Sequence, residues 1–467
     1  MITGRTRPWV HLTEPNLAMP NGMAEIPPSP LTGAADAEIH NLARTLGFAS
    51  ALCLVVVRFG MLHELFTYAF HAHLYLPYLF GIPALLALVA SGGIRRVFQG
   101  KAAYFWTAYT LWMFAAVPFS SWRGGSFDLA FKYLRSEYVV FLAIAGLAVT
   151  WGECKTMLRA IAWSGVGAML IARYFQSARF QAQSRLSLEF GTIADPNDFA
   201  CVLLLLLPLM LWLGLGSKSG IVRLVLFPAL PYGVYVILST GSRGGLVGLL
   251  AEAALFLCLG TMRQRVALLI LGAVIVPVTV AALPRQTLRR ITSFSQEEAG
   301  GEDAGAVGSR ATRQYMLRKS IEDTLKYPIF GVGPGQMVSF EGGRSKTSSS
   351  PGVWQNAHNV WLQASSECGI PALIFFVGGV VSTWRRLKAT HRKARARPDC
   401  ADIRTAVFCV MVGMGGFLAA ATFLNFAYLF YAPALGALAI VISPAAAREF
   451  ETRSAGAGQG IASVQRA

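Results

Sequence analysis

The chain has 467 residues, of which 54% are hydrophobic and 14% are charged. Soluble domains carry about 25% charged residues, so this composition excludes an ordinary soluble protein. Lysine and arginine outnumber aspartate and glutamate by 41 to 24, which gives a formal net charge of +17. No nucleic-acid-binding motif accompanies this surplus of positive charge. Such a surplus is typical of cytoplasmic loops and of contact with anionic lipids.

Apolar stretches of about 20 residues, enough to cross a bilayer, recur along the chain and predict an all-α polytopic membrane protein. Residues 1–42 contain six prolines and lack a signal-peptide pattern, so we expect a disordered cytoplasmic tail there. About twelve transmembrane helices are predicted. Their spans are 43–60, 74–91, 102–119, 137–151, 156–173, 199–215, 221–239, 244–260, 266–283, 359–384, 404–422 and 427–444.

The basic loops predict the orientation of these spans. The sequences "SGGIRRVFQGK", "GLGSKSGIVR", "GTMRQR" and "WRRLKATHRKARARPDCADIR" lie in alternate loops. By the positive-inside rule these loops face the cytoplasm, which places both termini there as well. Residues 43–283 then form the first nine helices and residues 358–444 the last three, followed by a second cytoplasmic tail at 445–467.

The longest segment on the opposite, periplasmic face is the loop 284–357, between the ninth and tenth helices. Its stretch "TRQYMLRKSIEDTL" has helical spacing, with Tyr315, Leu317, Ile321 and Leu325 on one side. We therefore expect a large, partly helical periplasmic loop. Loops of this length are more often functional than simple connectors.

Motifs for metal or nucleotide chemistry are missing from the sequence. The seven cysteines form no CxxC pair, so neither a disulfide framework nor a zinc site is indicated. There is no HExxH, GxSxG or DxD motif, and "GVGPGQ" neither follows a predicted strand nor continues into GK[ST]. We therefore expect chemistry that needs no metal and no cofactor.

Arg243, in "LSTGSRGGLVGLLAE", lies between two predicted spans on the periplasmic side. An arginine there could snorkel to a lipid headgroup, or it could hold an anionic ligand in the bidentate geometry that suits phosphate. Taken alone, the sequence favours neither alternative. Glu252, deeper in the following helix, is expected to give structural support as the partner of an arginine.

Arg310 and Arg313 in the large loop precede Arg318 and Lys319. A solvated helix face accounts for Arg318 and Lys319. Arg310 and Arg313 fall where the predicted helix begins, and a cation there is unfavourable with respect to the helix dipole and calls for an anion. These two arginines are therefore candidates for contact with an anionic substrate.

The segment "GTIADPNDFA" precedes the sixth predicted span. Its residues Asp195 to Asp198 are typical of a helix N-cap and turn. We expect Asp198 to be the cap and to support the structure. Asp195 is then open to bind an acceptor sugar or to orient an arginine.

The stretch "WQNAHNVWLQASSECGIPAL" begins polar and runs into a long apolar segment. On a helix that begins near Asn359, the side chains of Asn359, Gln363, Ser366 and Glu367 share a face. Polar groups at membrane depth usually face a cavity or the bundle interior. We expect this stripe to line a functional cavity with His358 at its top, although His358 alone is equally explained as an interfacial residue bonded to water. Glu367 is expected to support helix packing or an arginine.

These stretches, in this order, resemble the O-antigen ligase/polymerase superfamily of bacterial envelope glycan enzymes. The resemblance covers "DPNDFA", "STGSRGGLVGLL", "SRATRQYMLRKSIEDTLKYPIFGVGPGQM" and "AHNVWLQASSECGIPAL", from about Asp195 to Leu373. Leu317 stands where relatives often have tryptophan, which we interpret as a packing difference without consequence for the chemistry.

The resemblance implies a GT-C-like enzyme of the bacterial inner membrane. Such enzymes transfer a sugar chain from undecaprenyl-diphosphate to a growing glycan, to lipid A core or to a protein, without a metal or nucleotide sugar. The family's arginines and loop histidine correspond to Arg243, Arg313 and His358. The arginines would stabilise the diphosphate, and the histidine would act as general base or only bind the substrate. Further substrate-binding candidates are Arg310, Asp195, Asn359 and Gln363.

Three functions remain open from the sequence. A polymerase of exopolysaccharide or O-antigen is favoured, because nothing identifies a lipid A or protein acceptor, and it would work beside a chain-length regulator and a flippase. An O-antigen ligase is the alternative. A flippase or transporter for the lipid-linked glycan is more distant, because transporters of this size often have two related halves and no such repeat is found.

Overall fold

The computed structural model of the protein describes residues 41–178, 184–292, 304–345 and 358–464, without the side chains of 304–313, 344–345 and 456–464. The predicted tail 1–42 therefore lies almost wholly outside the described residues. Within the described part the fold is helical, apart from an isolated bridge between Gln176 and Leu188. The all-α class predicted from the sequence is confirmed.

A helix lies at each of the predicted membrane spans. These helices are α2 (Leu42–Phe59), α4 (Leu76–Ala90), α6 (Lys101–Ala116), α8 (Val139–Leu147), α9 (Trp151–Tyr174), α11 (Pro196–Gly216), α12 (Gly220–Ser239), α13 (Arg243–Leu259), α14 (Met262–Ala282), α18 (Val360–Arg395), α19 (Ala401–Ala421) and α20 (Tyr431–Val464). Seven of the described helices are long and apolar enough to cross a membrane, so the polytopic class is confirmed. The full count of about twelve stays a prediction.

Some of the remaining spans are shorter or interrupted. α13 has 17 residues and α4 has 15. α8 continues from α7 (Arg123–Lys132) through a π-helical segment, Tyr133–Tyr138. Such π segments often mark functional sites, and this one lines a cavity at one end of the helix bundle.

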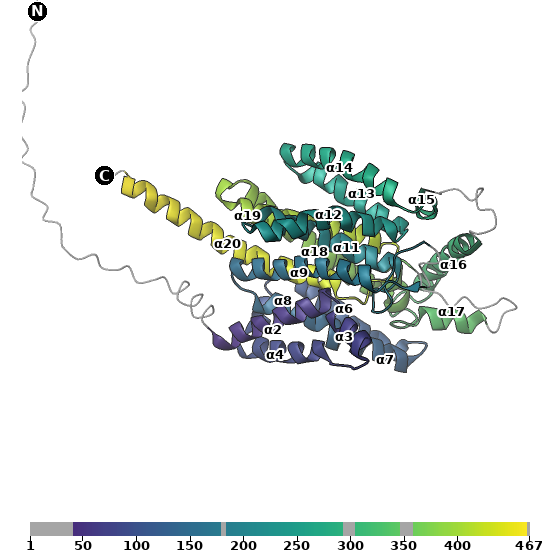
Figure 1. Ribbon diagram of the computed structural model, residues 1–467. Coiled ribbons are helices and arrows are strands. Elements are labelled where there is room, and N and C mark those ends of the chain that lie inside the picture. The colour runs from purple at the N-terminus through teal and green to yellow at the C-terminus, as the bar shows by residue number, and fades with distance from the viewer. Residues whose placement is uncertain (1–40, 179–183, 293–303, 346–357, 465–467) are drawn as a thin grey trace, which may run out of the picture.

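α11 forms the centre of the helix bundle, and α14 lies at its edge (Figure 1). In the most apolar stretch of α11 83% of the residues are buried inside the protein, whereas in α14 only 6% are. Both helices are strongly apolar, so the difference reflects their places in the bundle. α14 presents exposed side chains such as Leu269 and Val278 that suit contact with lipid. α2 and α4 lie at the edge opposite α13 and α14 (Figure 1).

The bundle has two different ends. We call the end with α15 (Arg285–Thr292), α16 (Ala304–Lys326) and α17 (Met337–Ser345) the loop end, and the other the tail end (Figure 1). These three helices belong to the predicted large loop. At the tail end α20 continues to Val464, through the segment predicted as a cytoplasmic tail.

α18 is broken where the predicted polar stripe ends. Gly369 has φ +82°, outside the helical range, and Pro371 has no N–H to donate. The carbonyls of Ser366 and Glu367 therefore lose their partners in the next helical turn. Inside a membrane an unpaired backbone group costs several kcal/mol, so other donors must reach these carbonyls.

The segment "YPIFGVGPG" of the large loop supplies those donors. Val332 N and Gly333 N donate to the carbonyls of residues 366 and 367, each at 2.9 Å. In return Ile370 N donates to the Pro328 carbonyl at 2.7 Å. We call this backbone contact between residues 328–333 and 366–370 the latch. It fixes the large loop to a transmembrane helix.

The connection between α6 and α7 covers the other side of the latch. Ser121 donates to the Val332 carbonyl from its backbone N at 3.0 Å and from its Oγ at 2.9 Å. Gly333 has φ +114°, and a Cβ at this position would overlap the Ser120 hydroxyl. Position 333 of the latch thus needs glycine, because its backbone conformation disfavours other residues and Ser120 leaves no space for a side chain.

The four residues that helical spacing places on one side of α16 do not form its buried face. Leu317 and Ile321 are 41% and 43% exposed, and Tyr315 and Leu325 are exposed as well. The buried face contains Met316, and next to it Thr324 Oγ1 lies 2.9 Å from Ser365 Oγ. The surface of α18 is polar at this level, so a face with hydroxyl groups matches it better than an apolar stripe.

Replacing Gly333 by alanine should loosen the latch. The new methyl group would overlap Ser120, and φ +114° is a conformation that costs a non-glycine residue about 1–3 kcal/mol. We expect Gly333→Ala to lower the midpoint of thermal unfolding in detergent. Gly343→Ala is the matched control, because that glycine has open space around it. Equal midpoints for the two variants would contradict the latch.

Candidate active site

Arg243, predicted from the sequence, is the first residue of α13 and follows a tight turn at the loop end. Gly241 has φ +63°, which favours glycine. Ser242 caps the helix by accepting a hydrogen bond from Gly245 N at 3.0 Å. The Arg243 side chain is exposed, and its Nε donates to the Arg290 carbonyl at 3.1 Å. The turn thus holds a guanidinium at the edge of the bundle.

Arg185 and Arg290, which the sequence analysis missed, lie beside the same turn. A Cβ on Gly241 would lie 3.2 Å from Arg290 Cδ and 3.6 Å from Arg185 Cγ. Arg185 is only 7% exposed, and its Nε donates to the Thr240 carbonyl at 2.9 Å. We call Arg185, Arg243 and Arg290 the arginine cluster. A signal for Arg185 and Arg290 was present, because both lie on the face where the positive-inside rule asks for no basic residue.

The segment "DPND" contacts the arginine cluster through Asn197. Asp195 is the N-cap of α11, because its side chain accepts from Asn197 N at 2.8 Å. The prediction that Asp198 is the cap was wrong, since Pro196 already occupies the first helical position. Asp195 Oδ1 also accepts from Asn197 Nδ2 at 2.8 Å, and Asn197 Oδ1 accepts from Arg185 Nη2 at 3.2 Å. A carboxylate thereby orients an arginine through one intervening amide.

His358 immediately precedes the N-cap of α18. It has φ +47°, which is uncommon for any residue with a side chain. Its backbone N donates to Asn425 Oδ1 at 2.9 Å, and the residue is half-buried. A specific side-chain contact therefore holds this residue in an unfavourable backbone conformation, which is a frequent property of functional residues.

The polar stripe below His358 faces neighbouring segments of the chain. Asn359 is the N-cap of α18 and accepts from two backbone N–H groups of the first turn, at 3.1 and 3.0 Å. The side-chain amide oxygen of Gln363, Oε1, accepts a hydrogen bond from Ala427 N at 3.2 Å. The Glu367 carboxylate accepts from Gly335 N at 2.8 Å, beside the latch. These contacts join α18 to the large loop and to the segment that follows α19.

The end of α19 lies next to both predicted parts of the site. Gly244 follows Arg243, and a Cβ on it would lie 3.7 Å from the Ala420 carbonyl oxygen. Asn425, a few residues later, holds the backbone of His358. Arg243 and His358 therefore both lie beside this one segment, although more than a hundred residues separate them in the sequence.

The other predicted site residues have mixed outcomes. Glu252 is buried in α13 and lies against Gly416 of α19, and within the described residues its Oε1 has no hydrogen-bond partner. The expected arginine partner is thus replaced by close packing on α19.

Arg310 and Arg313 belong to α16, but their side chains lie outside the described residues.

A cavity of about 640 Å³ opens at the loop end between α2, α3 (Leu62–Phe70), the π-helical segment and residues 428–429. None of the predicted site residues lines it. His63 does, and burial lowers the pKa of this histidine. The sequence signal was "HELFTYAFHAH", a segment rich in histidine.

A buried ion pair forms one wall of this loop-end cavity. Arg58 Nη2 lies 2.6 Å from Glu137 Oε1, and their side chains are 10% and 8% exposed. Glu137 Oε2 also accepts from Phe430 N at 3.1 Å. The pair therefore ties α2, the π-helical segment and the chain after α19 together.

Residues 224–377 match the family model described as O-antigen ligase. Over these residues, about a third of its length, the chain is similar to that family, and we call residues 224–377 the matched segment. The match confirms the resemblance predicted from the sequence, and it supports glycan transfer in O-antigen or polysaccharide assembly by an enzyme of the glycosyltransferase type. A search of curated proteins found no match.

The matched segment extends from α12 into α18. It contains the turn of Arg243, the latch and His358. Arg185, Asp195 and the lining of the loop-end cavity lie outside it. The parts of the chain outside the matched segment thus contribute a buried arginine and a polar cavity to the same end of the bundle.

The effects of replacing Arg58 and Glu137 on stability should be strongly coupled. Removing one member of a buried pair leaves an uncompensated charge and typically costs about 3–5 kcal/mol. We therefore expect Glu137→Leu to lower the midpoint of thermal unfolding in detergent more than the double variant Arg58→Met/Glu137→Leu does. If the losses of the two single variants simply add in the double variant, the pair is not coupled.

Proposed function

We propose that the protein transfers a glycan from undecaprenyl-diphosphate to an acceptor hydroxyl at the periplasmic face of the bacterial inner membrane, and that it thereby polymerises an exopolysaccharide or O-antigen. One observation carries the proposal. Within the matched segment, a cationic turn and a histidine lie beside the same end of α19. A cation for the leaving group and a proton acceptor for the nucleophile are what this reaction needs.

The arginines act on the donor. When the glycan leaves its carrier, negative charge develops on the diphosphate, and preorganised donors in a partly dehydrated site stabilise it. Arg243 is suited to this because a turn and a carbonyl contact fix its guanidinium at the membrane edge. We assign the same role to Arg313, with Arg310 as a further phosphate contact. Both belong to α16 of the large loop.

His358 acts on the acceptor. Its imidazole takes the proton as the acceptor oxygen forms a bond with the anomeric carbon. The bond from that carbon to the diphosphate oxygen breaks, and its electron pair leaves with the carrier, so the configuration inverts. Because Asn359 and Gln363 are engaged with backbone groups, they position the histidine within reach of the substrate. The carrier already activates the glycan, so the reaction needs no metal or cofactor.

A polymerase needs the fewest kinds of substrate. Its acceptor is a second carrier-linked glycan, which approaches from the same membrane as the donor. An O-antigen ligase acting on lipid A core or a protein is the alternative. In a polymerase pathway a flippase supplies the substrate and a chain-length regulator limits the product.

Arg243→Ala and His358→Ala should each abolish most of the transfer. Losing one such group typically lowers the rate by about 10²–10³-fold. Membranes that contain each variant would be given undecaprenyl-diphosphate-linked glycan, and product would be measured after electrophoresis. Matched controls are Arg263→Ala and His391→Ala, which remove the same side-chain types from the tail-end half of the bundle. Normal product from both active-site variants would refute the assignment.

The acceptor class is tested with the unmodified protein. Supplied only with carrier-linked repeat units, a polymerase should produce a ladder of longer carrier-linked chains, because donor and acceptor are the same kind of molecule. A ligase should produce none until lipid A core or a protein acceptor is added. Thin-layer or gel separation of the lipid-linked products distinguishes the two.

A further inference from the structure

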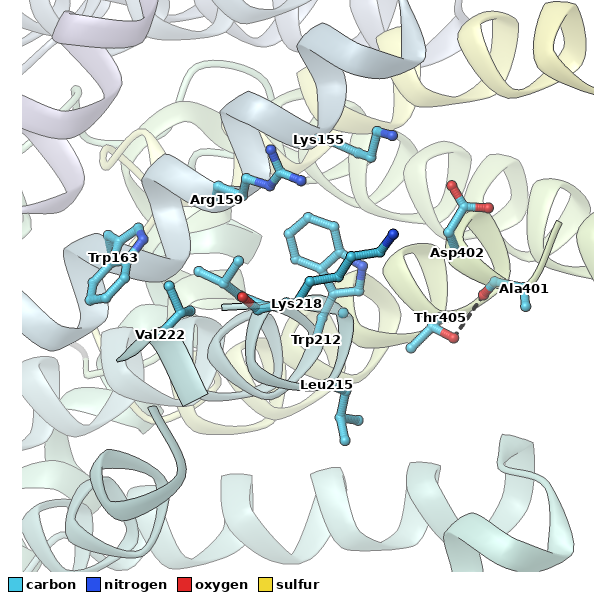
Figure 2. A pocket seen from close by; sticks show the side chains of 13 residues that line it. Lys155, Arg159, Trp163, Trp212, Leu215, Lys218, Val222, Ala401, Asp402 and Thr405 are labelled. Carbon is cyan, nitrogen blue, oxygen red and sulfur yellow. Dashed lines mark hydrogen bonds between the residues drawn. The ribbon is translucent and has the colours of Figure 1, made fainter. Parts of the chain in front are cut away.

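A second cavity, of about 760 Å³, lies at the tail end of the bundle (Figure 2). It opens between the first turns of α9, the connection from α11 to α12 and the start of α19. We call it the tail-end cleft. It is lined by Lys155, Arg159, Trp163, Trp212, Leu215, Lys218 and neighbouring residues. None of the residues assigned to glycan transfer belongs to this lining.

Three cations from two different segments reach into the tail-end cleft. Lys155 and Arg159 stand one turn apart on α9, so they share a face of that helix. Lys218 comes from the connection between α11 and α12, and Figure 2 shows its side chain beside the Trp212 ring, with Lys155 and Arg159 on the far side of that ring. None of the three forms an ion pair within the described residues.

The cleft contains one carboxylate, Asp402, and other groups already contact it. Asp402 Oδ1 lies 2.9 Å from Arg453 Nη1, and Asp402 Oδ2 accepts from Trp151 Nε1 at 2.8 Å. Arg453 belongs to α20, does not line the cleft and also contacts Glu449. The cleft therefore has three cations against one carboxylate, which is bound to an arginine outside the lining. Gathering like charges at one site is unfavourable unless an anion joins them.

The walls of the cleft select the kind of anion. Trp212 and Leu213 are buried in the wall, whereas Trp163 and Leu215 are 39% and 53% exposed along its open side. Tryptophan side chains prefer the headgroup level of a bilayer, with the apolar ring toward the acyl chains. A cleft lined by both cations and exposed apolar side chains matches a phosphate that carries hydrocarbon chains.

We propose that the tail-end cleft binds the phosphate of an anionic membrane lipid. Lys155, Arg159 and Lys218 surround the phosphate, and Trp163 and Leu215 contact the start of its acyl chains. Basic clefts between transmembrane helices on one side of a membrane are well suited to anionic lipid headgroups. Inorganic phosphate shares the charged half of this chemistry but would leave the apolar side of the cleft unused.

The test compares two triple variants of equal charge in purified, delipidated full-length protein. Lys155→Gln/Arg159→Gln/Lys218→Gln empties the cleft of cations. Its matched control, Lys388→Gln/Arg392→Gln/Lys393→Gln, removes three cations from the tail-end half of α18 outside the cleft. Titration calorimetry measures the binding of short-chain phosphatidylglycerol, with phosphatidylcholine and inorganic phosphate as comparison ligands.

We expect the unmodified protein to bind phosphatidylglycerol more tightly than the other two ligands. Each removed cation should weaken this binding about fivefold, so the cleft variant should lose about 100-fold. The control variant should lose far less. Equal losses in the two triple variants, or undiminished binding in the cleft variant, would overturn the proposal. Equally tight binding of inorganic phosphate would overturn the assignment to a lipid.

The single variant Lys218→Gln covers the case in which the triple cleft variant does not fold. Lys218 is exposed and lies in a connection between helices, so its replacement should leave the fold intact. A loss of phosphatidylglycerol affinity of about fivefold is expected from it, and no loss would count against the site. Glycan transfer by this variant should stay normal, which separates the outcome from that of the proposed enzyme activity.

Discussion

The loop end of this protein depends on two backbone carbonyls in the membrane. A helix inside a bilayer has no water to satisfy groups that its own turns leave unpaired. The break at Gly369 creates such groups at residues 366 and 367, and the glycine-rich segment of the large loop pairs with both of them. The loop is therefore attached to α18 because the helix would otherwise contain unsatisfied carbonyls. That attachment holds the polar stripe of α18 and the end of α16 at the same level.

Hydrogen bonds to backbone carbonyls also orient the guanidinium groups of the arginine cluster. Arg185 and Arg243 donate to carbonyl oxygens of Thr240 and Arg290. A carbonyl orients a guanidinium without supplying a full negative charge, so a contact of this kind leaves the arginine able to attract an anion. The amide of Asn197 has a similar effect, because it separates Asp195 from Arg185. These hydrogen bonds to carbonyl and amide oxygens orient the guanidinium groups of Arg185 and Arg243 beside the turn at Gly241.

Local patterns in the sequence predicted the helices, whereas contacts between distant segments could not be predicted from them. Apolar runs located the spans, because lipid imposes one length and one polarity on every helix that crosses it. The latch pairs residues more than thirty positions apart, and "GVGPG" and "ECGIP" show only that each backbone bends. Spacing predicted a helix at α16 but not its buried face, since the polar surface of α18 decides which side fits. Arg185 and the loop-end cavity were missed because their neighbours come from several segments, although an arginine on the periplasmic side was a usable signal.

Both ends of the bundle gather cations, and the two proposals together raise the question of how one protein would distinguish two phosphates. A lipid-linked diphosphate shares the bilayer with abundant anionic lipids, so exposed and flexible cations alone would bind both. At the loop end Arg185 is buried and oriented by hydrogen bonds to an amide and a carbonyl, which favours a ligand with matching oxygen positions. At the tail end Lys218 and Arg159 are exposed, and their charges can follow a phosphate of any orientation. On these proposals, the buried and oriented Arg185 beside Arg243 would favour the specific substrate, and exposed cations would suit a lipid that needs only to be retained.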